Sequence, residues 1–434
     1  MEYSEIVCEI LSRLPVKSLM RFKCVCKKWQ SIIKDDRYFI DLYNTRSKLR
    51  PCLVLFIPIH RKFNITPGST YTLYRRFQAN LLIADLCEGV AEEAATTPHN
   101  VWKTTSIKFD KVIHKERVGY DGIFKSVNGL ICFTDTTWEF GVRIYNIATR
   151  ELTPWMSTTF IQKEERVVPE FDFGFDPATK QHKVICFWKI ERNYGRKDSY
   201  PVYAGCEVLT LGDNTWRIIN IDEFPQHEHE HDSYFSTYGF VYVNGYIYWT
   251  TRRLVYGCRP EKRVIVAFDV GSEKFKIILV PKFITDQLLS LHDTEYIDFF
   301  NSSKDLLEVN DRVALFCRVP GGHTVKLWIL DCDHTSSCSQ NWTETTIDLP
   351  FQGDNKRVVV FHGIPGTDEI IIETYEDSRS IKGLSLTSYN WKSMTSRKVE
   401  SAELNHFNSP KKPSERGVFM CSTMTESLFS VYKK

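Results

Sequence analysis

The sequence lacks the features that mark several large classes of protein. Its apolar runs fall well short of the roughly twenty residues that a membrane-spanning helix requires. The net charge of its 434 residues is only +2, so no overall positive field is present to attract nucleic acid or an anionic membrane. These absences exclude a helical membrane protein and argue against nucleic acid as the main partner.

Two short motifs of common enzymes are missing as well. The chain has no Gly-x-Ser-x-Gly, and the glycine-containing stretches at 320–322 and 363–366 lack the Gly-Lys-Ser/Thr of a phosphate-binding loop. His227, His229 and His231 alternate with acidic residues, but an extended chain gives such imidazoles no fixed support. We therefore interpret that stretch as an acidic loop, and we expect no catalytic residue, no metal and no cofactor.

The thirteen cysteines do not form a disulfide framework. Their number is odd, their spacing is irregular, and no apolar signal segment precedes Ile6. This pattern is typical of free thiols in a reducing compartment. The expected location is the cytosol, the nucleus or both.

The first forty residues have a helical period. Apolar residues recur at spacings of three and four from Ile6 to Leu14, and Pro15 ends that helix. A short second helix follows from Val16, and a third is expected from Phe22 to Ile33. Three helices of this size bury too little surface to be stable alone, so the pattern predicts a partner.

The same segment resembles the F-box of plant F-box proteins. The resemblance rests on the strings at 9–19 and 21–27 and on Trp29; it departs from the family where Met1-Glu2-Tyr3 replaces the usual Leu-Pro, and where Asp36 replaces a proline. It implies docking to a Skp-type adaptor, and through it to the cullin and RING subunits of an SCF ubiquitin ligase. The residues expected to bind the adaptor are Leu11, Leu14, Pro15, Val16, Leu19, Val25, Cys26 and Trp29.

After residue 50 the period becomes that of strands. Residues 51–57 predict a buried strand, and residues up to about 118 are poorly patterned and predict a loop region. Paired strands then recur every forty to sixty residues; Asn244-Gly245 predicts a two-residue hairpin, and Trp216, Trp342 and Trp391 mark later strands. This cadence is typical of propeller blades, and the apolar residues from 418 predict a last strand that returns to complete one.

The β region also resembles the F-box-associated domain of the same plant proteins, through the phrases at 127–132, 174–177 and 243–249. The expected fold is an α+β multidomain chain: a small three-helix F-box, then a large all-β, β-propeller-like domain. We divide it into an F-box at 1–45, a connecting strand and loop region at 46–122, and the substrate-recruiting domain at 123–434. The helices and the β domain are expected to form separate cores.

The resemblance implies a non-catalytic receptor that links an unidentified target protein to the ligase. Target specificity is expected in loops around 188–203, 225–236 and 282–308. Two alternatives stay open: a propeller-fold enzyme, and a DNA-binding regulator that uses the basic helix with Lys23, Lys27, Lys28 and Lys34. The target, the number of blades and the effect of the missing Leu-Pro do not follow from the sequence.

Overall fold

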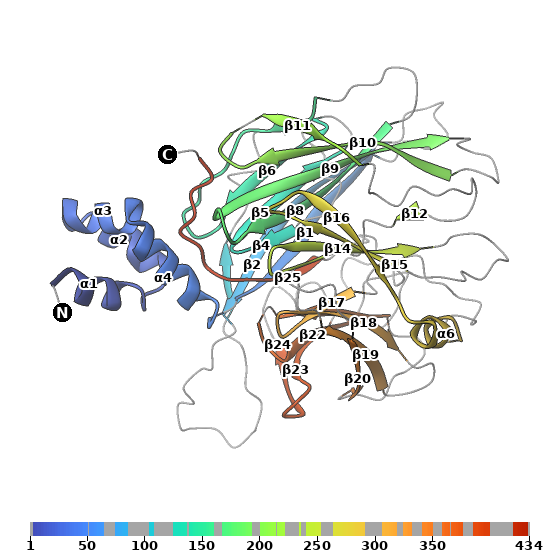
Figure 1. Cartoon of the computed structure of the whole chain (residues 1–434). Coiled ribbons are helices and arrows are strands. Elements are labelled where there is room, and N and C mark those ends of the chain that lie inside the picture. The colour runs from blue at the N-terminus through green and yellow to red at the C-terminus, as the bar shows by residue number, and fades with distance from the viewer. Residues whose placement is uncertain are drawn as a thin grey trace.

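The chain forms a cluster of helices beside a ring of β-sheets (Figure 1). The structure is a computed structural model. It describes residues 3–50, 52–64, 74–85, 104–107, 125–136, 139–159, 167–192, 200–213, 215–221, 234–235, 240–252, 264–290, 306–318, 324–331, 341–349, 358–364, 366–375, 385–399 and 420–432. All structural statements below concern those residues.

Four helices make up the N-terminal cluster, where the sequence predicted three. They are α1 (Tyr3–Leu11), α2 (Val16–Phe22), α3 (Lys27–Asp35) and α4 (Arg37–Ser47). The expected third helix is shorter at its start because residues 23–26 form a turn and Cys26 caps α3. Asp36 caps α4, its side chain accepting the N–H of Phe39 at 3.2 Å. A short polar side chain at this position therefore begins another helix, which a proline there could not cap in this way.

The described strands form six antiparallel sheets. The first contains β25 (Met420–Met424), β1 (Cys52–Asn64), β2 (Tyr74–Asp85) and β3 (Thr104–Ile107); the second contains β4 (Lys125–Val127), β5 (Leu130–Asp135), β6 (Gly141–Asn146) and β7 (Met156–Ser157). The third contains β8 (Val167–Asp176), β9 (Gln181–Arg192), β10 (Tyr200–Thr210) and β11 (Trp216–Ile219).

The second half of the chain supplies the other three sheets. The fourth contains β12 (Tyr234–Phe235), β13 (Val241–Val243), β14 (Tyr246–Arg252), β15 (Val264–Asp269) and β16 (Lys274–Leu279), and helix α6 (Lys282–Ser290) follows it. The fifth contains β17 (Leu306–Val309), β18 (Arg312–Arg318), β19 (Thr324–Asp331) and β20 (Asn341–Asp348). The sixth contains β21 (Val358–Gly363), β22 (Glu369–Tyr375), β23 (Ser385–Asn390) and β24 (Thr395–Val399).

The C-terminal strand closes the ring. β25 pairs with β1, with Cys52 opposite Met424 and Phe56 opposite Met420. β25 also contacts β4 on one side and β21 on the other, so the last residues complete the first sheet. The predicted return of the chain is confirmed, and the prediction of a loop region up to residue 118 is wrong where β2 and β3 lie. Their assignment to strands depends on pairing with β1, which a local pattern does not report.

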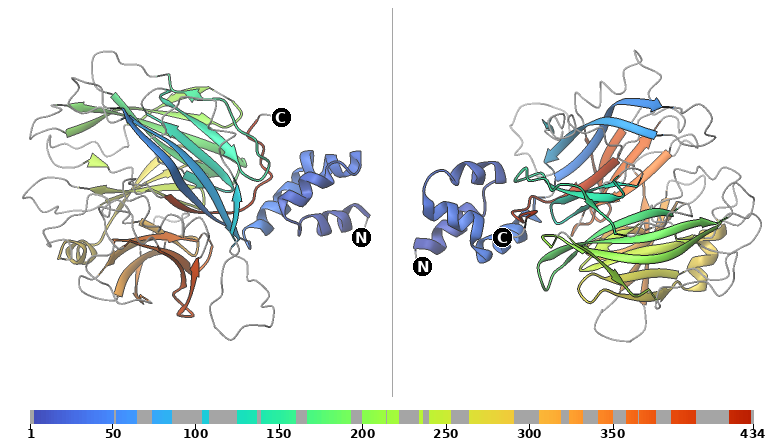
Figure 2. Two further views of the ribbon diagram at one scale, coloured as in Figure 1. Left: turned by 180° about the vertical axis from the view of Figure 1, so that it is seen from behind. Right: turned by 90° about the horizontal axis from the view of Figure 1, so that it is seen from above.

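Neighbouring sheets share their cores. One buried cluster joins the second and third sheets through Ile144 and Phe173, and another joins the fifth and sixth through Leu327 and Ile372. From the second sheet to the sixth, each sheet covers an apolar face of the next, as propeller blades do. Figure 2 shows the sheets arranged around a common centre with the helices to one side.

Tight turns gather on the face of the ring that meets the helices. Asn128-Gly129, Asn244-Gly245 and Asn310-Asp311 are two-residue hairpins in which both residues have positive φ, which confirms the hairpin predicted at 244–245. The side-chain amide of Asn244 donates to the carbonyl of Asp311 at 3.1 Å, so turns of adjacent sheets touch. We call this side the turn face, and the opposite side of the ring the loop face.

A second kind of turn is repeated on the same face. It starts at Asn146, Asp176, Asp269 or Asn390, whose side-chain oxygens accept hydrogen bonds from the residues two and three positions later. The fifth residue of each turn has positive φ, between 55° and 62°. Asx turns of this form fix the direction of the chain as it enters the next strand.

Candidate protein-docking surfaces

The helical cluster has a small core of its own. Val7, Leu11, Leu19, Ile33 and Tyr43 are among its buried side chains. Arg46 of α4 ties α1 to this core, since its guanidinium donates to the Glu9 carboxylate at 2.6 Å and to the Ser12 hydroxyl. The hydrogen bonds from Arg46 and Arg13 lower the pKa of Glu9 below its ordinary value.

The structure separates the eight residues expected to bind the adaptor. Leu11, Val16 and Leu19 are buried in the helical core, so their side chains offer no surface to a partner in this conformation. Leu14 and Trp29 are half-buried against it. The remaining three are exposed: Pro15, Val25 and Cys26.

Two further apolar side chains reach the surface of α1. Ile6 is 45% exposed and Ile10 is 57% exposed, while Val7 and Leu11 of the same helix are buried. Because residues four apart share one face of a helix, Ile6 and Ile10 form a second apolar stripe. The sequence prediction missed them as contact residues, although the width of the apolar pattern in this helix was the available signal.

The turn before α3 adds to this apolar surface. Val25 is 60% exposed, and Trp29 meets Phe22 edge to face with ring centroids 5.4 Å apart. Cys26 has a local role as well, because its Sγ accepts the N–H of Trp29 at 3.5 Å. We call Ile6, Ile10, Pro15, Val25 and Trp29 the helical apolar surface.

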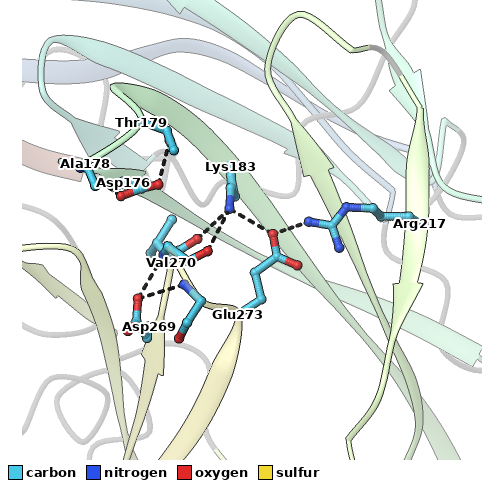
Figure 3. Close-up of polar contacts among 10 residues, drawn as sticks. Asp176, Ala178, Thr179, Lys183, Arg217, Asp269, Val270 and Glu273 are labelled. Atoms are coloured by element: carbon cyan, nitrogen blue, oxygen red, sulfur yellow. Dashed lines mark hydrogen bonds and ion pairs between the residues drawn. The ribbon is translucent and has the colours of Figure 1, made fainter.

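A cluster of ion pairs and hydrogen bonds joins the third and fourth sheets on the turn face (Figure 3). The Lys183 ammonium donates to the carbonyl oxygens of Val270 at 2.7 Å and Gly271 at 3.3 Å, and to Glu273 Oε1 at 2.8 Å. Arg217 also donates to that carboxylate. Three acceptors match the three donors of a lysine, so this lysine is committed to joining the third sheet to the fourth.

The carboxylates of this cluster are held in the ionised form. Burial alone would raise the pKa of Glu273, but the hydrogen bonds from Arg217 and Lys183 outweigh it and the pKa lies below its ordinary value. Asp176 behaves similarly: hydrogen bonds from Thr179 and Ala178 overcome burial and lower its pKa. The cluster therefore has the character of a structural ion-pair network.

Other buried titratable groups are spread over the third, fifth and sixth sheets. Burial lowers the pKa of His182, on β9, to about 3, and its ring stacks on Phe173. Burial, assisted by Asp311, raises the pKa of Glu308, on β17, to about 8. His362 and Glu373 form a buried pair at 2.8 Å in the sixth sheet. The printed partners of these groups lie in the same sheet or in a neighbouring one, so the contacts do not assemble the groups into one acid–base site.

The described residues carry neither a metal-binding cluster nor a membrane-spanning helix. They contain no group of three or more His, Cys, Asp or Glu placed to hold a metal ion; His227, His229 and His231 lie outside them. No described helix is long and apolar enough to cross a membrane.

The connections expected to carry target specificity all join strand ends on the loop face. β9 ends at Arg192 and β10 begins at Tyr200, and both of these strand ends lie on the side opposite the 176–180 turn. Residues 282–290 of the third stretch form α6, which lies away from α1–α4 in Figure 1. Most of 225–236 lies outside the described residues.

Two family models match the chain. The F-box domain model matches residues 4–41, which are α1 to α4, and the F-box associated beta propeller domain model matches residues 93–424, most of the ring of sheets. The chain belongs to the F-box-associated propeller family. Its fold is that of the family: short N-terminal helices followed by a large all-β, propeller-like domain.

Relatives in Arabidopsis thaliana align with most of this chain. The F-box protein At1g70970 is 28% identical over 86% of this chain and 85% of its own, and the F-box protein At3g10240 is 26% identical over 91% and 84%. The chain spans only 58% of the F-box protein At1g47790, at 28% identity over 64% of this chain. Among solved structures, the β-propeller domain of the trilobed protease of Pyrococcus furiosus aligns over 80% of this chain and 92% of its own, with a TM-score of 0.31 and 9% identity, which is too distant to support an argument.

Proposed function

We propose that this family member is the substrate-recognition subunit of an SCF ubiquitin ligase, a non-catalytic receptor. The observation that carries the proposal is the helical apolar surface. The helices bury one apolar set in their own core and still expose Ile6, Ile10 and Val25. Side chains of this size each lose about 1.5–3 kcal/mol of favourable burial when left in water, so an uncovered set on so small a cluster fits a docking site for the Skp-type adaptor.

The arrangement of the two parts supports the receptor role. The helices meet the turn face, where Ala148 of the 146–150 turn packs against the helical core. The loop face points away from them, so a target held there would not compete with the adaptor for space. The proposed contribution to ubiquitination is proximity: the receptor holds a target lysine near the conjugating enzyme, and the bond-forming chemistry belongs to other subunits.

The described cysteines support a reducing location. Seven of them, including the exposed Cys24 and Cys26, are free thiols. We therefore propose the cytosol, the nucleus or both as the compartment, as an SCF subunit requires.

The test is direct binding of the full-length chain to a purified plant Skp adaptor by isothermal titration calorimetry. The variant Ile6→Asp/Ile10→Asp places two charges on the helical apolar surface without touching the core. The control, Ile218→Asp, changes an isoleucine that is 74% exposed on β11 of the propeller.

We expect the wild type and Ile218→Asp to bind equally, and Ile6→Asp/Ile10→Asp to bind at least about 100-fold more weakly, which corresponds to roughly 3 kcal/mol. No binding by the wild type, or equal binding by the double variant, would overturn the proposal. Titration of the same preparations with duplex DNA at two salt concentrations tests the DNA-binding alternative, which requires an affinity that falls steeply with salt.

A further inference from the structure

The residues after β25 connect the propeller to the helices. Residues 425–432, which we call the C-terminal strap, leave the first sheet and run between the ring and α1–α4, as the red segment in Figures 1 and 2 shows. The sequence pattern predicted a strand here. The structure instead gives an irregular segment with its polar and apolar groups divided between two bodies.

On the helical side, the strap completes α2. The N-cap of α2 is Pro15, whose side chain makes no capping hydrogen bond. The first N–H groups of a helix need an acceptor from outside the helix, and Glu426 supplies one: its Oε2 accepts the N–H of Val16 at 3.0 Å. The same oxygen accepts the hydroxyl of Tyr43, on α4, at 2.6 Å. One carboxylate from the far end of the chain thus holds α2 and α4 together.

The strap also fills the helical core. Leu428 is 7% exposed and belongs to the same buried cluster as Val16, Leu19 and Tyr43. Its backbone N–H donates to the side-chain oxygen of Asn44 at 3.0 Å. The expectation of separate cores is therefore wrong at this point, because a residue from the C-terminal segment is part of the helical core.

On the propeller side, the strap is bonded to the turn face. The Asn146 side-chain amide donates to the carbonyls of Ser427 at 3.1 Å and Phe429 at 2.7 Å. The Tyr432 hydroxyl donates to the carbonyl of Leu152 at 2.6 Å, and Val431 is buried in the core between the second and third sheets. The ring of Phe429 lies 5.3 Å from that of Phe175.

We propose that the C-terminal strap is part of the adaptor-docking module: it holds the corner at Pro15-Val16 in its docking conformation and fixes the F-box on the turn face. The proposal rests on the proposed function for the identity of the partner. Within eight consecutive residues, the strap places Leu428 in the helical core and Val431 in the propeller core. The helical cluster therefore cannot rotate against the propeller without removing one of these two side chains from its site. Glu426 is then a positioning residue for docking, although it lies 410 positions from Val16.

Hydrogen–deuterium exchange of the full-length chain tests the strap without any adaptor. The variants are Glu426→Ala and Leu428→Ala, with Glu426→Gln as the conservative change that keeps an acceptor oxygen. The matched control is Tyr432→Phe, which removes a strap hydrogen bond made only to the propeller. We expect exchange in α2 to accelerate by on the order of tenfold or more in Glu426→Ala and Leu428→Ala, less in Glu426→Gln, and not at all in Tyr432→Phe.

Adaptor affinity is then measured on the same four variants. We expect a loss on the order of tenfold for Glu426→Ala and Leu428→Ala, because part of the binding free energy is spent in restoring the corner, and no loss for the control. Unchanged exchange in α2, or faster exchange with unchanged adaptor affinity, would overturn the strap proposal. If the variants show the exchange effect but the wild type binds no adaptor, the proposed function is refuted instead, so the two failures are distinguishable.

Discussion

Asn146→Asp is a substitution that removes contacts to the C-terminal strap and leaves the turn that carries this residue intact. Asn146 uses both ends of its side chain: Oδ1 accepts the N–H groups of Ala148 and Thr149 at 2.8 and 3.2 Å, and Nδ2 donates to the carbonyls of Ser427 and Phe429. A flipped amide would place donors against donors, so the assignment is consistent at all four contacts. Aspartate keeps the acceptor that forms the turn, as Asp176 and Asp269 show in other sheets. It loses both donors to the strap.

The magnitude follows from those two contacts. Each buried hydrogen bond contributes about 0.5–1.5 kcal/mol net, and a carbonyl left without its donor costs about 1–3 kcal/mol more if water cannot reach it. A total of about 2–4 kcal/mol against the docked strap is therefore expected. If the strap exchanges by local opening, its amide exchange should accelerate roughly 30- to 700-fold, since each tenfold step corresponds to about 1.4 kcal/mol.

The assay is hydrogen–deuterium exchange by mass spectrometry, following a peptide that covers residues 425–432 and one that covers the 146–150 turn. The control is Asn390→Asp in the equivalent turn of the sixth sheet, where Oδ1 accepts the N–H groups of Lys392 and Ser393. We expect fast exchange in the strap, with the 146–150 turn unchanged, for Asn146→Asp only. An unchanged strap, or equal effects of the two substitutions, would refute the assignment of Asn146 as the propeller-side anchor.

Three further changes test other parts of the structure. Gly129→Ala should lower the midpoint of thermal unfolding by several degrees, because Gly129 has φ +81° and an added Cβ would clash with Ser427; a midpoint equal to that of the wild type would contradict this. Glu273→Gln should destabilise the chain by about 1–3 kcal/mol at pH 7. Because its pKa is lowered in the folded state, the contribution of Glu273 is complete above the ordinary value of 4.5 and is lost as pH falls through the lowered folded-state value, so denaturant titrations should show a smaller difference at pH 3 than at pH 7. Removal of residues 418–434 should leave β1 as an open sheet edge and cause aggregation in size-exclusion chromatography; a monodisperse monomer would show that the ring does not need β25.

Much of the fold is encoded by local patterns. The Asn-Gly pairs need positive φ at two successive residues, and this requirement makes the hairpin at 244–245 predictable from two letters of sequence. Asx turns recur after Asn146 and Asp176. Trp216 and Trp342 lie in strands, as predicted, but the prediction is wrong for Trp391, which lies in the turn after β23.

The candidate site was less predictable because burial is a property of tertiary structure. Periodicity placed Leu11, Val16 and Leu19 on an apolar face, but it could not say whether that face meets the helical core or an adaptor. Periodicity likewise gave no reason to expect Ile6 and Ile10 on the surface of the helical cluster. The helix α4 was missed because Asp36 was treated as a departure from proline rather than as an N-cap, the interpretation that its short acceptor side chain supports.

The strap could not be predicted from sequence because its pairs are separated by almost the whole chain. No local pattern links Val16 to Glu426 or Asn146 to Phe429. The segment from Ser427 to Tyr432 is rich in apolar and aromatic residues, as strands are, so its local composition favoured β structure. Its apolar residues are instead divided, with Leu428 in the helical core and Val431 in the propeller core. That division is the signal of a bridging segment, and it becomes visible only when both cores are known.

This division also bears on how a receptor of this kind places its target. A ligase receptor joined to its adaptor module by a flexible linker would present a bound protein over a wide range of positions, and the effective concentration of target lysines would fall accordingly. Here the chain crosses between the two bodies twice: once after α4 into β1, and once through the strap after β25. These two crossings, with Leu428 and Glu426 fixed among the helices, restrict both the tilt and the rotation of the helical cluster relative to the propeller. The loop face is therefore held at a set direction from the helical apolar surface. In the proposed receptor, geometry as well as binding would then select the target lysines that are delivered.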